Sequence, residues 1–142
     1  MKKKKVWLSI TGKTAMESES DDIIELITEG EFYRQDKSAY LSYDESEVSG
    51  LEGTKTTIEL EKEKLSIIRL GSMNSHMIFE KGKRNLNTYA TPYGAMTMSV
   101  YTQDIDVDYD QNDQPTKIFV DYNIEISGQG VSKNTLNIDV KH

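Results

Sequence analysis

Apolar and polar residues alternate with a period of two along much of the chain. In residues 117–127 (KIFVDYNIEIS) every second position is apolar, and only Phe119 interrupts the polar face: the apolar positions are Ile118, Val120, Tyr122, Ile124 and Ile126. This period is that of a half-buried antiparallel strand. Similar alternation, or a short run rich in β-branched and aromatic residues, occurs in residues 54–61, 64–70, 76–80, 104–110 and 135–140. Turn-favouring segments separate these runs, so the pattern predicts a β-sandwich or a β-barrel.

Residues 23–27 (IIELI) fit a helix and a strand about equally well. Their apolar residues fall at helical spacing, Ser20 or Asp21 is available as an N-cap, and Gly30 follows at the place of a C-terminal cap. Over the longer stretch that ends at Glu47, the pattern instead indicates two strands around a turn at residues 35–38. The remaining sequence contains no other candidate helix.

Composition and charge predict one globular domain, residues 1–142, and limit the classes of function. The chain is 36% hydrophobic and 29% charged over 142 residues, which is enough for a substantial core and is not typical of a disordered protein. Its 17 basic and 24 acidic residues give a net charge of −7, which repels nucleic-acid phosphates. We therefore expect no nucleic-acid partner and no membrane partner.

The amino terminus is the one basic segment. Residues 1–5 include four consecutive lysines, a run too short for a basic tract, and we expect a frayed, solvated end. The apolar run that follows, Val6 to Ile10, is shorter than the h-region of about 7–15 residues in a secretion signal. The sequence has no cysteine, which excludes disulfides and thiolate chemistry. Cytoplasmic localisation is the default expectation.

The sequence offers no metal site and no catalytic constellation. Four aspartates alternate with apolar residues, which predicts that all four lie on the outer face of a strand: Asp104, Asp106, Asp108 and Asp110. The series lacks the glycine and the glutamate that an EF-hand calcium loop requires. Because His76 and His142 are the only histidines, neither a three-histidine zinc site nor a persuasive triad can be assembled. We expect no metal and no cofactor, assign no catalytic residue, and favour a protein that is not an enzyme.

Several segments resemble the YwiB-like family of small, uncharacterised bacterial proteins. The most specific are YDESEVSG at residues 43–50, the arginine and glycine of IIRLG at residues 67–71, and TPYG at residues 91–94. The resemblance runs from about Ile23 to Val140. It implies an all-β, antiparallel, roughly eight-stranded calycin-like barrel of the lipocalin and streptavidin type, in which residues 23–28 form a strand. It implies no known activity.

The stretch from Tyr89 to Met96 (YATPYGAM) combines turn residues with two tyrosines. Pro92 at the second position of TPYG and Gly94 at the fourth are typical of a type I turn. Tyr89 and Tyr93 have large amphipathic rings, which cover apolar surface while their hydroxyls form hydrogen bonds. We favour a structural corner at one end of the barrel; the alternative is a rim that contacts a ligand.

Arg69 lies among apolar neighbours in KLSIIRLG and continues one apolar face of that strand. In YLSYDESE, one face of the expected strand carries Tyr43, Glu45 and Glu47. A guanidinium can bind a carboxylate in a bidentate way, so we expect Arg69 to pair with Glu45 or Glu47 inside one end of the barrel. The pair is either a structural latch, which we favour, or an anchor for an anionic or polar ligand.

Three classes of function compete, and we rank a binder of a small polar or anionic molecule first. Barrels of about eight strands either hold one small ligand or are filled by their own side chains. The candidate ligand-binding residues are Arg69, Tyr43, Glu45, Glu47, Tyr89 and Tyr93. The alternative is a protein-interaction or structural barrel, including a homodimer, whose interior is filled by Met77, Phe79, Met96, Met98 and tyrosines. A hydrolase or isomerase ranks third.

Overall fold

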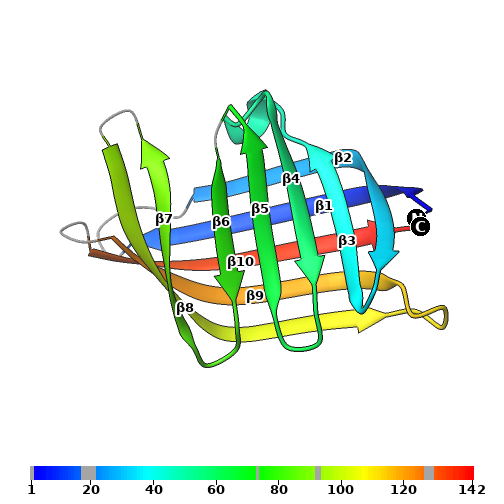
Figure 1. The fold of residues 1–142 in the computed structure, drawn as a ribbon. Coiled ribbons are helices and arrows are strands. Elements are labelled where there is room, and N and C mark those ends of the chain that lie inside the picture. Colours follow the sequence, from blue (N-terminus) through cyan, green and yellow to red (C-terminus); the bar gives the residue numbers. More distant parts are fainter. Residues whose placement is uncertain (1, 17–21, 73, 92–93, 127–129) are drawn as a thin grey trace.

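The chain forms one antiparallel sheet that curls into a barrel (Figure 1). The computed structural model describes residues 2–16, 22–72, 74–91, 94–126 and 130–142, and gives no side-chain detail for residues 16, 49, 88–91 and 95. The described residues include ten strands and one short 3-10 helix, η1 (Glu47–Ser49). The strands are β1 (Lys4–Met16), β2 (Asp22–Gln35), β3 (Ser38–Asp44), β4 (Thr54–Leu60), β5 (Leu65–Gly71), β6 (Ser75–Phe79), β7 (Arg84–Thr91), β8 (Gly94–Tyr109), β9 (Pro115–Ile126) and β10 (Gly130–Lys141).

The barrel is nearly closed. Its strand order is β6-β5-β4-β3-β2-β1-β10-β9-β8-β7, so β6 and β7 are the two edges of the sheet. These edges lie side by side without pairing as strands, and one bridging contact is the Asn85 Nδ2 amide, which donates to the backbone oxygen of Ile78 at 3.4 Å. The all-β antiparallel architecture is therefore confirmed, with ten strands rather than eight.

The two additional strands are β1 and β7. The expectation of a frayed end at residues 1–5 is wrong from Lys4 onward, because Lys4 pairs with Phe32 and Lys5 pairs with Glu31 across β1 and β2. Burial of the inward side chains holds β1 against the rest of the barrel. The first of these side chains, Val6, is 1% exposed and belongs to the core.

Long strands turn two corners of the barrel. The first part of β2, from Asp22 to Phe32, pairs with β1, and its last part pairs with β3. Strand β8 likewise pairs first with β7 and then with β9, with a bulge between Thr102 and Asp104. As a result, β3, β4, β5 and β6 form a layer that crosses in front of β1, β10 and β9 in Figure 1. The candidate site lies between these two layers.

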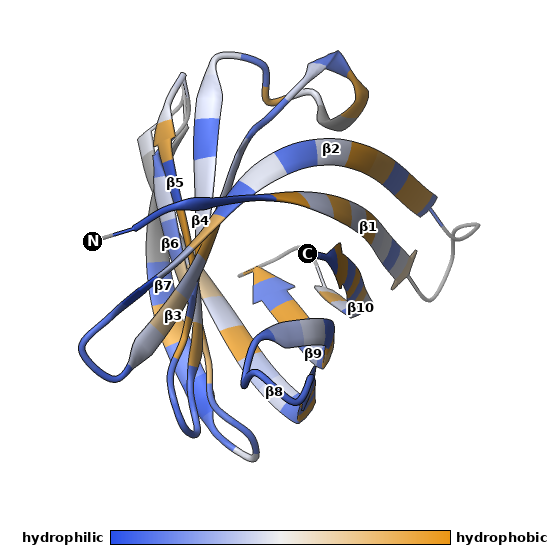
Figure 2. Cartoon of the chain, turned by 90° about the vertical axis from the view of Figure 1, so that its right-hand side faces the viewer, coloured by the Kyte–Doolittle hydropathy of each residue, from blue (hydrophilic) through white to orange (hydrophobic). Residues whose placement is uncertain are grey.

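The core also lies between the layers, where the inward residues of each strand meet. Figure 2 shows apolar and polar residues alternating along the strands. The largest fully buried side chains are Phe79, Leu8, Leu41, Ile58, Leu65, Ile118 and Ile138. The alternation predicted for residues 117–127 is confirmed at the start of this range, where Ile118 and Val120 are buried while Lys117 is exposed; residues 121–124 are all half-buried, and residue 127 lies outside the described residues.

Two local predictions have clear outcomes. Residues 23–28 belong to β2, and the turn to β3 falls between Gln35 and Ser38, with Asp36 at a φ of 57°.

The placement of all four aspartates on a strand is wrong for Asp110, which follows β8. Its Oδ1 accepts hydrogen bonds from the backbone N–H groups of Asn112 and Gln114 and so fixes a turn.

No helix of the described residues has the length and apolarity needed to span a membrane.

Candidate functional site

Arg69 and Glu45 meet between the layers of the barrel. The Nε atom of Arg69 lies 3.8 Å from Oε1 of Glu45, and the Glu45 side chain is only 2% exposed. The Arg69 side chain is 23% exposed. Of the two carboxylates expected for Arg69, the structure brings Glu45 to it. The contact is an ion pair rather than the expected bidentate pair, because 3.8 Å is too long for a hydrogen bond.

The strand alternation and a backbone hydrogen bond place this pair. Arg69 follows the buried Ile67 on the inward face of β5, and Glu45 follows the buried Tyr43 on the face of β3. Just beyond β3, the Glu45 N–H donates to the backbone oxygen of Thr54 at 2.8 Å, which keeps this residue beside β4. The hydroxyl of Thr56, which is fully buried, donates to Glu45 Oε1 at 2.7 Å.

Glu47 does not join this cluster. The chain leaves the strand after Asp44, and Glu47 begins η1 with an exposed side chain, so the period of two ends before it. Ser46 Oγ accepts the N–H of Val48 at 3.3 Å and fixes this change of direction.

The corner at Tyr89–Tyr93 lies largely outside the described residues. The backbone of Tyr89 belongs to β7, opposite Met96, but its side chain is not described, and Pro92 and Tyr93 fall outside the described ranges altogether. Their candidate role as a rim therefore stays a prediction.

A cavity of about 220 Å³ adjoins the Arg69–Glu45 pair. Its lining comes from both layers and includes Tyr43, Glu45 and Arg69 from the candidate residues. Sequence reasoning assigned no site role to other lining residues: Gly12, Asp22, Leu51, Thr56 and Tyr122. The alternation in TKTTIELE does put Thr56 on the same face as Ile58, which was a signal for its inward position.

Because Gly12 has no side chain, the cavity keeps free space next to β1. A Cβ added at Gly12 would meet no atom within 4 Å. The position lies in a regular strand, paired with Leu136 on one side and Ile24 on the other. A Cβ at Gly12 would therefore displace no neighbour, and a longer side chain would extend from it into the cavity that Gly12 lines.

Two phenols beside the cavity are held in the neutral form. Burial, followed by the negative charge of Glu45, raises the pKa of Tyr43 above its usual value. Burial also raises the pKa of Tyr122, while the positive charge of Arg69 opposes this shift. Both phenols thus keep their O–H proton at neutral pH; that of Tyr43 already donates to Glu45, and that of Tyr122 is the donor left for a ligand.

The Nε atom of Arg69 is buried and has no hydrogen-bond partner among the described residues. A guanidinium carries donors only, and a buried donor without an acceptor costs about 1–3 kcal/mol. The pair with Glu45 compensates the charge without providing that hydrogen bond. The cavity wall at Arg69 therefore contains a hydrogen-bond donor for which the described residues provide no acceptor.

Another part of the interior is filled by side chains of the barrel itself. Met77, Phe79 and Met98 are buried, and the ring of Phe79 packs edge-on against Tyr122 at 4.8 Å between centroids. The predicted filling by Met77, Phe79 and Met98 is thus present beside the cavity and does not eliminate it, whereas Met96 is only half-buried.

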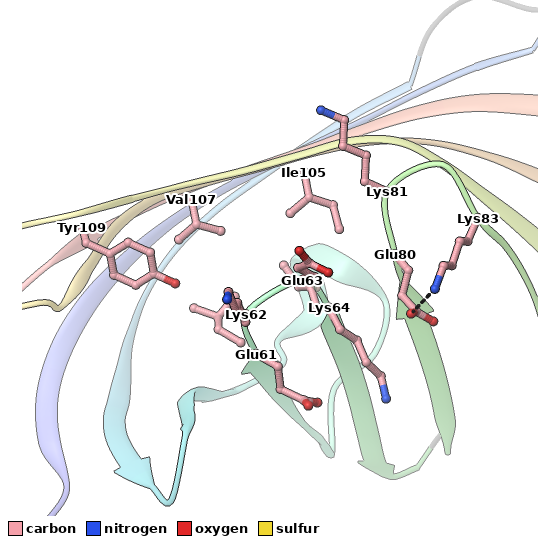
Figure 3. Close-up of a pocket in the computed structure, with 12 residues that line it drawn as sticks. Glu61, Lys62, Glu63, Lys64, Glu80, Lys81, Lys83, Ile105, Val107 and Tyr109 are labelled. Atoms are coloured by element: carbon pink, nitrogen blue, oxygen red, sulfur yellow. Dashed lines mark hydrogen bonds and ion pairs between the residues drawn. The ribbon is translucent and has the colours of Figure 1, made fainter.

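A larger hollow of about 460 Å³ lies elsewhere and has a different character (Figure 3). It lies between the turns at residues 61–64 and 80–83 and the inward residues Ile105, Val107 and Tyr109 of β8. Most of its charged side chains are exposed, and one of them, Lys83, pairs with Glu80 at 3.4 Å. Charges that are already solvated have little to gain from a ligand, so we place the candidate site at Arg69.

The arrangement at Arg69 can hold an acceptor group of a small molecule. The guanidinium and the neutral phenol of Tyr122 supply donors. Glu45, which is itself held by the hydroxyl of Thr56, pairs with the guanidinium. The described lining residues include no histidine, and His142 lies elsewhere, with its Nε2 2.8 Å from the backbone oxygen of Pro115.

Comparison with known proteins supports the fold and identifies the family. No curated protein matches the sequence significantly. The crystal structure of the ywiB protein from Bacillus subtilis aligns with a TM-score of 0.75 over 96% of this chain and 92% of that chain, at 19% sequence identity. At this identity the likeness shows the fold alone. The family model described as a domain of unknown function, DUF1934, matches residues 8–138. The chain therefore belongs to the DUF1934 family, in agreement with its resemblance to YwiB-like proteins.

Proposed function

We propose that this protein binds a small anionic molecule in the cavity between its two layers. The observation that carries the proposal is the buried Nε atom of Arg69, which lacks a hydrogen-bond partner among the described residues. That nitrogen is covered by neighbouring atoms, so a ligand reaches it through a small shift of the partly exposed Arg69 side chain, and an acceptor group placed there recovers the free energy of an unsatisfied donor. Glu45 and Thr56 hold the guanidinium in position before the ligand arrives, which reduces the entropic cost of binding.

Thermal unfolding in the presence of small carboxylates and inorganic phosphate tests this proposal. A ligand that binds only the folded state stabilises it by mass action, by about 2.7 kcal/mol at one hundred times its Kd. We expect at least one of these anions to raise the Tm of the wild-type protein at millimolar concentration. Arg69→Lys, which keeps the charge but loses the planar fork, should show a smaller shift.

Two neighbouring positions on β1 provide a blocked variant and its control. Gly12→Leu places a side chain in the cavity and should abolish the shift in Tm, whereas Thr11→Leu alters the other face of the strand and should keep it. An equal shift in both variants would place the bound anion outside the cavity. If none of the anions stabilised the wild-type protein, the proposal would also be wrong.

A homodimer is a second candidate, favoured by an apolar patch on the outer face of the barrel. Trp7 is 50% exposed and Ile27 is 74% exposed, on adjacent strands. Both line a surface hollow of about 730 Å³ together with Lys117, Asp139 and Lys141. In a two-fold interface the same surface faces its own copy, so the surface must be complementary to itself. Charges of both signs beside an apolar patch meet this requirement, because each charge can face an opposite charge on the second copy.

Sedimentation velocity tests this second candidate. A dimer should dissociate on Ile27→Lys, because an unpaired charge would be buried at its centre. Leu86→Lys is the control, since Leu86 is 72% exposed on β7 and away from the patch. A wild-type protein that sediments as a monomer at high concentration would rule this dimer out.

A further inference from the structure

The cavity at Arg69 has an apolar side as well as a polar side. Ile10, Ile58, Ile67 and Ile138 line it, and each is at most 9% exposed. The polar groups Tyr43, Glu45, Thr56 and Arg69 belong to β3, β4, β5 and the segment after β3. Two of the isoleucines, Ile58 and Ile67, lie on β4 and β5 next to these groups, and β1 and β10 contribute mainly aliphatic side chains and Gly12. A compact hydrated anion would leave this aliphatic surface without contacts. A ligand that fits both sides must carry an apolar body.

The charges around the cavity limit the charge of the ligand. Arg69 is its one positive lining residue, and Glu45 and Asp22 are its two negative ones among the residues that the structure describes. Glu45 already compensates much of the charge on Arg69 at 3.8 Å. A second negative charge on the ligand would face repulsion from these carboxylates, so a single charge is favoured.

The volume limits the size of the ligand. A cavity of about 220 Å³ corresponds to roughly seven water molecules of liquid, and hence to a molecule of roughly seven non-hydrogen atoms. This volume is below the range of about 300–1,000 Å³ that is usual for drug-sized ligands.

We infer that the ligand is a small amphipathic monoanion, with a carboxylate head at Arg69 and a short aliphatic body against the isoleucines. This inference rests on the proposed function and narrows it to one class of molecule. The carboxylate accepts hydrogen bonds from Arg69 and from the phenol of Tyr122, and its single charge is tolerated beside Glu45. The aliphatic body replaces water at the apolar side of the cavity.

Isothermal titration with four probes tests the inference. Hexanoate has both parts, 1-hexanol lacks the charge, acetate lacks the aliphatic body, and inorganic phosphate is compact and multiply charged. For the wild-type protein we expect hexanoate to bind at least tenfold more tightly than each of the others. Arg69→Met should remove the preference for hexanoate over 1-hexanol. Gly12→Leu should weaken both of these probes at least tenfold, and Thr11→Leu should weaken neither.

The outcomes separate this inference from the proposed function. If acetate or phosphate bound as tightly as hexanoate, and Gly12→Leu abolished that binding, the amphipathic ligand class would be wrong and the cavity would remain an anion site. Equal binding of hexanoate and 1-hexanol would overturn the role of the carboxylate head. If Gly12→Leu affected no probe, both the inference and the proposed function would be wrong.

Discussion

At the scale of single residues, the alternation along β3 and β5 predicts the central contact of the site. An inward position for Arg69 and for Glu45 follows from counting by two from the buried residues before them, and the structure places both groups accordingly. Glu45 lies just past the end of β3 on backbone that stays extended as far as Ser46, whereas the rule fails for Glu47, where η1 begins and turns the side chain outward. Alternation predicts a face only as long as the backbone stays extended.

Removing one partner of the Arg69–Glu45 pair should cost less than in a fully buried pair. A fully buried pair loses about 3–5 kcal/mol when one partner is removed. Arg69 is partly exposed and Thr56 still donates to Glu45, so we expect Arg69→Leu to cost under about 2 kcal/mol. Urea denaturation of both single variants and of Arg69→Leu/Glu45→Leu should give a double variant more stable than the sum predicts.

The same cycle distinguishes a latch from a binding site. A loss of several kcal/mol for Arg69→Leu alone, largely restored in the double variant, would mean that the pair is chiefly structural. Small additive losses would show that Arg69 and Glu45 are not coupled, contrary to this account.

Gly94 should tolerate no side chain, for a reason of backbone conformation. Its φ is 115°, a region that residues with a Cβ rarely adopt, although a Cβ there would meet no atom within 4 Å. We expect Gly94→Val to lower the free energy of unfolding by roughly 1–3 kcal/mol. Gly12→Val is the control, because Gly12 has equal space without a positive φ. Equal stability of the two variants in urea denaturation would refute the strain at Gly94.

At the scale of elements, strands are predictable where their inward face is apolar. The inward face of β9 is apolar. In β7 the pattern is the opposite, because the apolar Leu86 faces solvent, 72% exposed, and the polar Asn87 faces inward, 8% exposed. In β1 the inward face loses its apolar character at Gly12 and Thr14, which line the cavity. The sequence therefore concealed β1 and β7, because hydrophobic alternation records burial in an apolar core and weakens beside a cavity or a polar interior.

The corner in β2 depends on a residue without a side chain. A Cβ at Gly30 would lie 2.7 Å from Leu8 Cδ1 and 2.7 Å from the backbone oxygen of Ser42, where β2 passes from β1 to β3. Gly30→Ala should therefore cost roughly 1–3 kcal/mol through overpacking. Gly12→Ala, which meets no neighbour, should be close to neutral by the same denaturation measurement. A neutral Gly30→Ala would show that the layers do not approach as closely as described.

At the scale of the whole molecule, the barrel combines a filled region with an open one. Met77, Phe79 and Met98 occupy the interior beside β6 and β8, and the cavity remains between β1, β10 and the β3–β5 side. Sequence reasoning presented these as alternatives, because a pattern of inward residues does not state how their volumes fill the space between two layers. Only the packing of both layers determines whether a cavity remains.

Native mass spectrometry of protein purified gently from its own host tests the central claim most directly. We predict that the wild-type protein and Thr11→Leu carry one small molecule per chain, and that Gly12→Leu, which fills the cavity, carries none. A wild-type chain without a small molecule, or a molecule retained equally by Gly12→Leu, would contradict the claim that the cavity at Arg69 is a ligand-binding site.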